Sequence, residues 1–228
     1  MENKKYIFIG KTVFFPKEKI LAIADLHLGY EEALRQGGLE VPLRQLEEVL
    51  DEIDKILEYI KVKYGKVKQV IFLGDVKHHF SYLASEKEEI KKLISFLRKK
   101  GIEEQNIIFI RGNHEKNEKN GKLVDFYIVK DICFIHGHRE FLEIYDQTIN
   151  LIVMGHIHPT VIISDEMKIK NEKYKCFLVG RYKKKEIVIA PSFHVITEGV
   201  CLTEFLDKKG YDYSIVPNKE IENFEVYP

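Results

Sequence analysis

The chain has no tryptophan, few cysteines, no excess of either charge sign and no long apolar run. Its three cysteines are an odd number, each in an apolar stretch, so we expect buried reduced thiols rather than a disulfide framework or a thiolate metal site. The apolar stretch behind Lys4 and Lys5 is interrupted by Lys11, which leaves it too short for a signal peptide or a membrane span. We therefore expect a cytoplasmic protein that does not cross a membrane.

The absence of net charge excludes a strongly basic nucleic-acid-binding coat. Lysine plus arginine and aspartate plus glutamate both total 36, although a local basic patch would not change that sum. Hydrophobic residues at 45% exclude a disordered chain, and 228 residues can form one large core. We expect a single domain spanning residues 1–228.

The first half of the chain alternates between predicted strands and helices. Apolar residues at helical spacing predict one amphipathic helix from Leu43 to Tyr64 and another from Ser85 to the stop at Gly101. Apolar, β-branched runs lie before, between and after them, and residues 6–15 predict a hairpin in front. This alternation predicts a parallel sheet with right-handed crossovers.

The second half is dominated by short strands. They are predicted at Phe126 to Val129, Ile132 to Ile135, Leu151 to Met154, Val161 to Ile163, Cys176 to Val179, Ile187 to Ala190 and Val200 to Phe205. We expect a second, largely antiparallel sheet packed on the first, with the charged stretches Ser164 to Lys175 and Tyr182 to Lys185 as hairpin tips. The predicted fold class is therefore α/β in the α+β sense.

Five polar clusters each follow a predicted strand. They are Asp25-Leu26-His27, Gly74-Asp75, Gly112-Asn113-His114, His136-Gly137-His138 and Gly155-His156-Ile157-His158. Because buried strands deliver the residues at their ends to the rim of a sheet, five such clusters can converge on one crevice. We expect His156 and His158, two residues apart in extended chain, to project the same way and to serve different metals.

Two divalent cations close together need oxygen and imidazole ligands. The clusters offer two carboxylates, four imidazoles and the amide of Asn113. With two divalent cations, the two carboxylates and one bridging hydroxide, the formal charge of the centre is +4 − 2 − 1 = +1. A positive centre suits a phosphate ester. Manganese is the first expectation, and this ligand chemistry also admits iron, zinc or nickel.

These clusters resemble the motifs of the calcineurin-like metallophosphoesterase superfamily: Asp-x-His, Gly-Asp, Gly-Asn-His-Asp/Glu, a later His and Gly-His-x-His. The resemblance implies a two-sheet mixed β-sandwich flanked by helices in four layers, α-β-β-α. It also implies a ligand assignment. The first metal would take Asp25, His27 and His158, the second Asn113, His136 and His156, and Asp75 would bridge them.

The motif Gly74-Asp75-Val76-Lys77-His78 ends in a histidine. In this it is similar to the branch of the superfamily that contains a double-strand-break repair nuclease. The stretch after Asp25 and the segment Pro191-Ser192-Phe193 look like small archaeal and bacterial phosphoesterases related to that nuclease. We expect the nuclease's DNA-binding extension to be missing, because the chain ends soon afterwards. A nucleic-acid-processing helicase or ligase would be the expected partner.

The resemblance implies that His114 contacts phosphate or protonates the leaving oxygen, with His78 or Glu115 tuning it; the alternative is that His114 only orients other groups. His79 could replace His78 if the turn is shifted. Attack on phosphorus by the bridging hydroxide is the expected reaction. Candidate substrate-binding residues are His138 and Arg35, whereas His194 is expected to be a surface or packing residue.

Three functions compete. The first is hydrolysis of phosphodiesters in nucleic acid, nuclease-like, in DNA repair or processing. The second is a phosphodiesterase acting on nucleotides or cyclic nucleotides. A metal-free scaffold of the same fold is the third, and it is disfavoured because every ligand position holds a competent residue. The sequence leaves the oligomeric state open.

Overall fold

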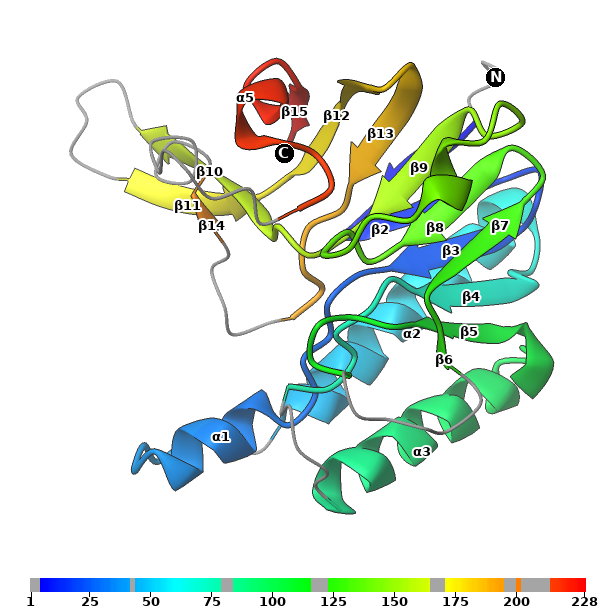
Figure 1. The fold of residues 1–228 in the computed structure, drawn as a ribbon. Coiled ribbons are helices and arrows are strands. Elements are labelled where there is room, and N and C mark those ends of the chain that lie inside the picture. Colours follow the sequence, from blue (N-terminus) through cyan, green and yellow to red (C-terminus); the bar gives the residue numbers. More distant parts are fainter. Residues whose placement is uncertain are drawn as a thin grey trace.

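The computed structural model describes residues 5–41, 44–78, 84–115, 123–164, 171–194, 200–201 and 214–228. Two six-stranded sheets pack face to face, and the long helices lie against the outer face of the first sheet (Figure 1). The predicted fold class, a mixed two-sheet sandwich with flanking helices, is confirmed. No helix in the described ranges is both long and apolar enough to cross a membrane.

The first sheet has the strand order β1-β2-β3-β4-β5-β6. Its strands are β1 (Ile7–Ile9), β2 (Thr12–Phe15), β3 (Ile20–Ile23), β4 (Gln69–Phe72), β5 (Ile107–Ile110) and β6 (Leu123–Val124). The pairs β1–β2 and β2–β3 are antiparallel, and the pairs from β3 to β6 are parallel. The predicted hairpin and the parallel sheet behind it are confirmed.

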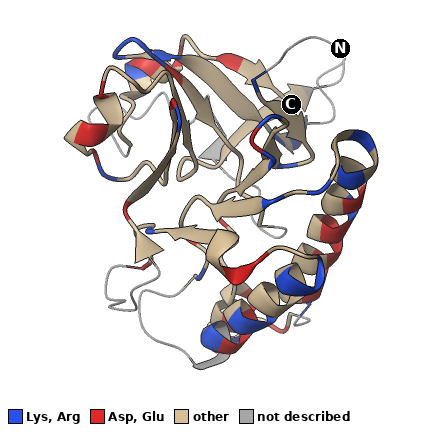
Figure 2. Cartoon of the chain, turned by 90° about the vertical axis from the view of Figure 1, so that its right-hand side faces the viewer, with Lys and Arg blue, Asp and Glu red and all other residues tan. Residues whose placement is uncertain are grey.

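Helices α2 (Gln45–Tyr64) and α3 (Ala84–Lys99) make the crossovers between parallel strands. Their apolar stripes bury residues such as Val49 and Leu93 against the sheet, and basic and acidic residues are interspersed along both helices (Figure 2). Gly65, with φ +83°, ends α2 as predicted. The expected start of the first helix at Leu43 lies outside the described residues, and α3 begins at Ala84, one residue before the predicted start at Ser85.

Helix α1 (Tyr30–Gln36) lies in a stretch where the sequence predicted no helix. It follows Gly29, whose φ is +86°, and its short length gives almost no periodic apolar pattern. A 3-10 turn, η1 (Glu104–Asn106), leads into β5.

Alternation along each strand explains the layers. In β3, Leu21 and Ile23 face the helices, whereas Ile20 and Ala22 face the second sheet. Between the sheets the aromatic ring of Phe15 meets that of Phe134 edge to face, with centroids 5.3 Å apart. Burial on both faces accounts for the continuous apolar runs before the polar clusters.

The second sheet has the order β15-β12-β13-β9-β8-β7. Its strands are β7 (Phe126–Val129), β8 (Ile132–Ile135), β9 (Leu151–Met154), β12 (Phe177–Tyr182), β13 (Lys185–Ile189) and β15 (Glu225–Tyr227). The expectation of a largely antiparallel sheet was wrong at its centre, where β8–β9 and β9–β13 are parallel. The connection from β8 to β9 carries a 3-10 turn, η2 (Leu142–Tyr145), and is long enough for a crossover. The outer face of the second sheet packs against Ile215 and α5 (Asn218–Ile221).

A third sheet, β11-β10-β14, corrects two expectations. Strands β10 (Pro159–Ser164) and β14 (Val200–Cys201) were assigned to the second sheet, and β11 (Asn171–Lys175) was assigned to a solvated hairpin tip. The outer part of this sheet is solvent-exposed on both faces, so β11 lacks the apolar signal of a buried strand. We call the paired strands β10 and β11 the arm; Figure 1 shows it projecting beyond the sandwich.

Candidate metal centre

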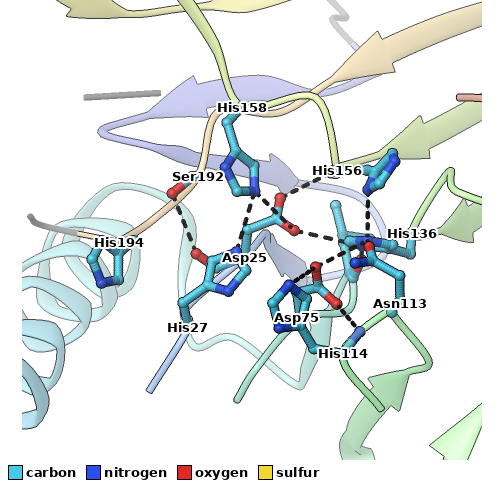
Figure 3. Close-up of polar contacts among 12 residues, drawn as sticks. Asp25, His27, Asp75, Asn113, His114, His136, His156, His158, Ser192 and His194 are labelled. Atoms are coloured by element: carbon cyan, nitrogen blue, oxygen red, sulfur yellow. Dashed lines mark hydrogen bonds and ion pairs between the residues drawn. The ribbon is translucent and has the colours of Figure 1, made fainter. Parts of the chain in front are cut away.

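The seven predicted metal ligands lie at the carboxyl ends of five strands. Asp25 and His27 follow β3, Asp75 follows β4, Asn113 follows β5, His136 follows β8, and His156 and His158 follow β9. Strands β3, β4 and β5 are parallel neighbours in one sheet, and β8 and β9 in the other. The structure therefore brings all seven side chains to one edge of the sandwich (Figure 3).

Asp25, His27 and His158 form one ligand group, whose candidate ligand atoms all lie within 4.8 Å of one another. The Nε2 atoms of His27 and His158 are 3.4 Å apart, and His158 Nε2 lies 3.4 Å from Asp25 Oδ1. Although this Asp25 oxygen is buried, it accepts no hydrogen bond from any described residue. A cation would supply the missing partner.

Asp75, His136 and His156 form a second group within the same distance limit. His136 Nε2 lies 3.0 Å from Asn113 Oδ1, 3.1 Å from His156 Nδ1 and 3.4 Å from Asp75 Oδ2. The other nitrogen of His136 donates to the Leu73 carbonyl at 2.8 Å when it carries the proton, which leaves Nε2 as a lone-pair donor. Nitrogen and oxygen lone pairs thus converge in both groups, so the residues present fit two divalent cations.

Five of these ligands have left-handed backbones that non-glycine residues rarely adopt. Their φ angles are +52° at Asp25, +46° at His27, +45° at Asp75, +72° at His156 and +51° at His158. The expectation that His156 and His158 project together from extended chain was therefore wrong. The two histidines do fall in different ligand groups, because each turn re-aims its own side chain.

Glycines leave room for the two carboxylates. A Cβ atom on Gly112 would collide with the Asp75 carboxylate, and a Cβ atom on Gly155 would collide with that of Asp25. Each carboxylate also accepts a backbone N–H from the cluster that contains this glycine: Asp75 from His114 and Asp25 from His156, both at 3.0 Å. The glycine in each motif is thus explained by the close approach of a carboxylate from another strand.

Electrostatics tie the two groups together. Burial would raise the pKa values of Asp25 and Asp75, but the surrounding imidazoles hold both pKa values well below the usual range. Burial would lower the pKa of His136, but its hydrogen bond to Asp75 and the charge of Asp25 raise it to about 9. Burial lowers the pKa of His27 to about 3. Without a metal, His136 therefore holds the proton that offsets the buried carboxylates.

The two predicted catalytic histidines lie beside the ligands. His114 Nε2 is 3.7 Å from Asp75 Oδ2, and the His114 ring centroid is 5.0 Å from that of His27. His114 Nδ1 donates to the His78 carbonyl oxygen, and the two rings are tilted with centroids 5.6 Å apart. Ring nitrogens of His27, His78 and His114 all lie within 4.8 Å of one another, and the His78 ring also lies edge to face with Tyr30, with centroids 4.7 Å apart. His79 lies outside the described residues.

Of the two predicted substrate-binding residues, only His138 lies near the ligands. Its ring centroid is 5.1 Å from that of His136 and 6.0 Å from that of His156. Arg35 lies in the last turn of α1, where its side chain is 51% exposed and pairs with Glu32 at 3.8 Å. The structure thus gives Arg35 a local ion pair on the surface of a helix rather than a place among the ligands.

Glu115 has a role that the sequence did not reveal. We expected it to tune His114, but its buried carboxylate accepts backbone N–H groups from two turns: from Gly112 at 2.8 Å in one, and from Val76 at 2.9 Å and Asp75 at 3.2 Å in the other. Burial, followed by the charge of Asp75, raises the pKa of Glu115 to about 7. Glu115 thereby joins the turn that carries Asp75 to the turn that carries Asn113.

Gln45 is another buried residue that was missed. Its side-chain N–H groups donate to the carbonyls of Leu26 at 3.1 Å and His27 at 2.8 Å, and its side-chain oxygen accepts from the Tyr30 N–H at 3.2 Å. A single glutamine at a helix start gives no sequence signal of such a contact.

His194 was expected to be a surface or packing residue. It is fully buried beside His27, so it is a packing residue and does not lie at the surface.

Comparisons with known proteins agree with this geometry. The model of the calcineurin-like phosphoesterase family matches residues 18–215. The crystal structure of the nuclease MPE from Pseudomonas putida is similar, with a TM-score of 0.56 and 21% sequence identity over 84% of this chain and 81% of that chain. At this identity the likeness shows a shared fold.

Two other solved structures are more distant. A Streptococcus pneumoniae protein described as a predicted phosphoesterase has a TM-score of 0.34 and 14% identity, covering 76% of this chain and 71% of that chain. Vps29 from Chaetomium thermophilum has a TM-score of 0.37 and 15% identity, with coverage of 77% and 72%. No curated protein matches the chain.

Replacing Glu115 by glutamine should disturb the centre without removing a ligand. One carboxylate oxygen becomes an NH₂ group that faces backbone donors, so we expect the free energy of unfolding to fall by about 1–3 kcal/mol. Metal content should fall as well, because Asp75 and Asn113 lose their common anchor. Urea unfolding and elemental analysis would measure both, with Glu222→Gln at an exposed position as the control. Unchanged stability would contradict the anchoring role.

Metal affinity should rise with pH. Since the pKa of His136 is about 9 without a metal, a cation bound below that pH must displace a proton. For one displaced proton the apparent affinity for Mn²⁺ should rise about tenfold per pH unit between pH 7 and 9. Calorimetry in two buffers with different ionisation enthalpies would count the released protons. An affinity that does not change over this range would contradict the protonation state assigned to His136.

Proposed function

Because the chain belongs to the calcineurin-like phosphoesterase family, whose members are dimetal-dependent phosphoester hydrolases, we propose that it hydrolyses phosphodiesters and that nucleic acid is its substrate. The observation that carries the proposal is the pair of ligand groups, which place two carboxylates, four imidazoles and an amide at one edge of the sandwich.

In this proposal Asp25, His27 and His158 would hold one cation, Asn113, His136 and His156 would hold the other, and Asp75 would be a ligand common to both. When bound, the cations would supply Lewis-acid chemistry, neutralising phosphate oxygens and favouring ionisation of water. Manganese suits this mixture of imidazole and oxygen ligands, and iron, zinc and nickel also do. The two buried aspartates leave the loaded centre positive, which attracts a phosphodiester anion.

His114 is the proposed general acid. Its Nδ1–H is held by the His78 carbonyl, so Nε2 is the nitrogen on the side of Asp75. The side chain is 14% exposed, which leaves it accessible to a substrate lying over the ligands. A proton held at Nε2 is therefore positioned for transfer to the oxygen that leaves phosphorus. His138, on the side of the second ligand group, is proposed to contact substrate.

The likeness to a nuclease favours nucleic acid over nucleotides as the substrate, and a role in DNA repair or processing would follow. Manganese-loaded protein should be assayed on single-stranded DNA, bis(p-nitrophenyl) phosphate and a cyclic nucleotide. We expect all hydrolysis to disappear in Asp75→Asn and single-stranded DNA to be cut by the parent protein. Hydrolysis of the small esters alone would refute the nucleic-acid assignment, and no hydrolysis of any ester would refute the enzyme.

The proton-donating role of His114 predicts a leaving-group effect. His114→Gln should slow DNA cleavage by about 10²–10⁴-fold, because an alkoxide needs a proton to leave. The effect on bis(p-nitrophenyl) phosphate should be much smaller, because p-nitrophenolate leaves without one. Metal content measured on the same samples should not change. Equal losses on both substrates would contradict proton donation and favour phosphate binding by His114.

A further inference from the structure

Residues 192–194 lie along the end of β3, directly behind two of the candidate ligands. The Phe193 N–H donates to the Ala24 carbonyl at 2.8 Å, and the His194 N–H donates to the Asp25 carbonyl at 3.2 Å. The Ser192 hydroxyl also donates to the Asp25 carbonyl, at 3.4 Å (Figure 3). We call these three residues the 192–194 segment; it holds the backbone that carries Asp25.

The carbonyls of the same segment point to two lysines. Lys175 Nζ donates to the Ser192 carbonyl at 3.0 Å and to the His194 carbonyl, and Lys11 Nζ donates to the Phe193 carbonyl at 3.1 Å. All three consecutive carbonyls therefore accept hydrogen bonds from ammonium groups. Hydrogen bonds to charged donors are stronger than those between neutral groups, so the segment is firmly fixed.

The segment fixes both the backbone and a ring at the metal centre. The left-handed backbone of Asp25 is unfavourable for a non-glycine residue and persists only where its surroundings hold it. The buried ring of His194 lies edge to face with His27, with centroids 6.0 Å apart, and with Tyr30 at 4.8 Å. A displacement of the 192–194 segment would thus move Asp25 and His27, two of the three ligands of the first group.

Lys175 belongs to the arm, which is attached to the centre at two points. Strand β10 begins at Pro159, immediately after His158, and its Thr160 is the cross-strand partner of Lys175 on β11. Lys173 lies two residues further out on the same face, where it is exposed. At the base of the arm Lys175 therefore contacts the 192–194 segment, whereas the outer residues of β11 are exposed.

We propose that Lys175 is a positioning residue for the metal centre, acting through the 192–194 segment to hold Asp25 and His27 in the geometry that binds the first cation. The inference rests on the proposed function only in requiring that this centre binds metal. Lysine suits the position because one ammonium group can donate to two carbonyls at once. Burial, followed by the charge of Lys11, lowers the pKa of Lys175 to about 8, so the group is still charged at neutral pH.

The test is Lys175→Met, which keeps the length of the side chain and removes the ammonium group. Mn²⁺ titration should show one of the two ions bound about 10–100-fold more weakly, as for other residues that orient metal ligands. Anomalous scattering from Mn²⁺-soaked crystals should show the loss at Asp25, His27 and His158 and full occupancy at His136 and His156. Lys173→Met removes the same charge from the neighbouring position and should leave both affinities within about twofold of the parent.

Two further variants keep the test decisive. Lys175→Arg should restore most of the affinity, because the guanidinium keeps the charge and several N–H donors. Lys11→Met removes the third carbonyl contact and should lower the affinity for the same ion by a smaller factor. This variant provides the test if Lys175→Met does not fold. Unchanged affinity in Lys175→Met or, failing that, in Lys11→Met overturns the inference, as does equal weakening of both ions. Failure of the parent protein to bind Mn²⁺ would instead overturn the proposed function.

Discussion

Two carboxylates buried side by side impose the constraint on which the rest of this structure depends. Asp25 and Asp75 are almost completely buried, and leaving two negative charges in such surroundings without compensation is costly. Imidazoles from the opposite sheet supply the compensation, through a proton on His136 or through bound cations. The centre therefore needs residues of both sheets.

Much of the chain near the ligands serves to keep these charges in place. Glu115 and Gln45 use their side chains to hold backbone rather than to contact a ligand, since both bond to main-chain groups of the turns after β3 and β4. Because five ligands occupy left-handed conformations, the turns would relax without such anchors. The geometry of the site thus depends on residues other than the candidate ligands.

The sequence predicted the positions of the candidate ligands better than it predicted the residues that support them. Asp25 and His156 each follow a strand that is buried on both faces, and β3 and β9 therefore stand out in the sequence as continuous apolar runs. Helix α1 and strand β11 were missed because short or exposed elements have little apolar periodicity. The parallel centre of the second sheet was missed because strand direction depends on the crossovers, which apolar runs do not reveal.

Supporting residues such as Glu115 and Lys175 could not be predicted for a different reason. Their partners are backbone groups distant in the chain, for example the carbonyl of Ser192 for Lys175, and any residue type supplies those groups. The assignment of His78 was incomplete in the same way, because one of its contacts with His114 is made by a carbonyl that every residue carries.

Because the arm begins directly after His158, selection would act differently on its base and on its outer residues. The inner pair, Thr160 and Lys175, adjoins the metal centre, and Thr160 is fully buried. The outer residues Ile162 and Tyr174 are 41% and 43% exposed and can change without disturbing the ligands. The arm can therefore diverge at its outer residues while its base stays fixed, which would allow new recognition properties to evolve without loss of the hydrolytic chemistry.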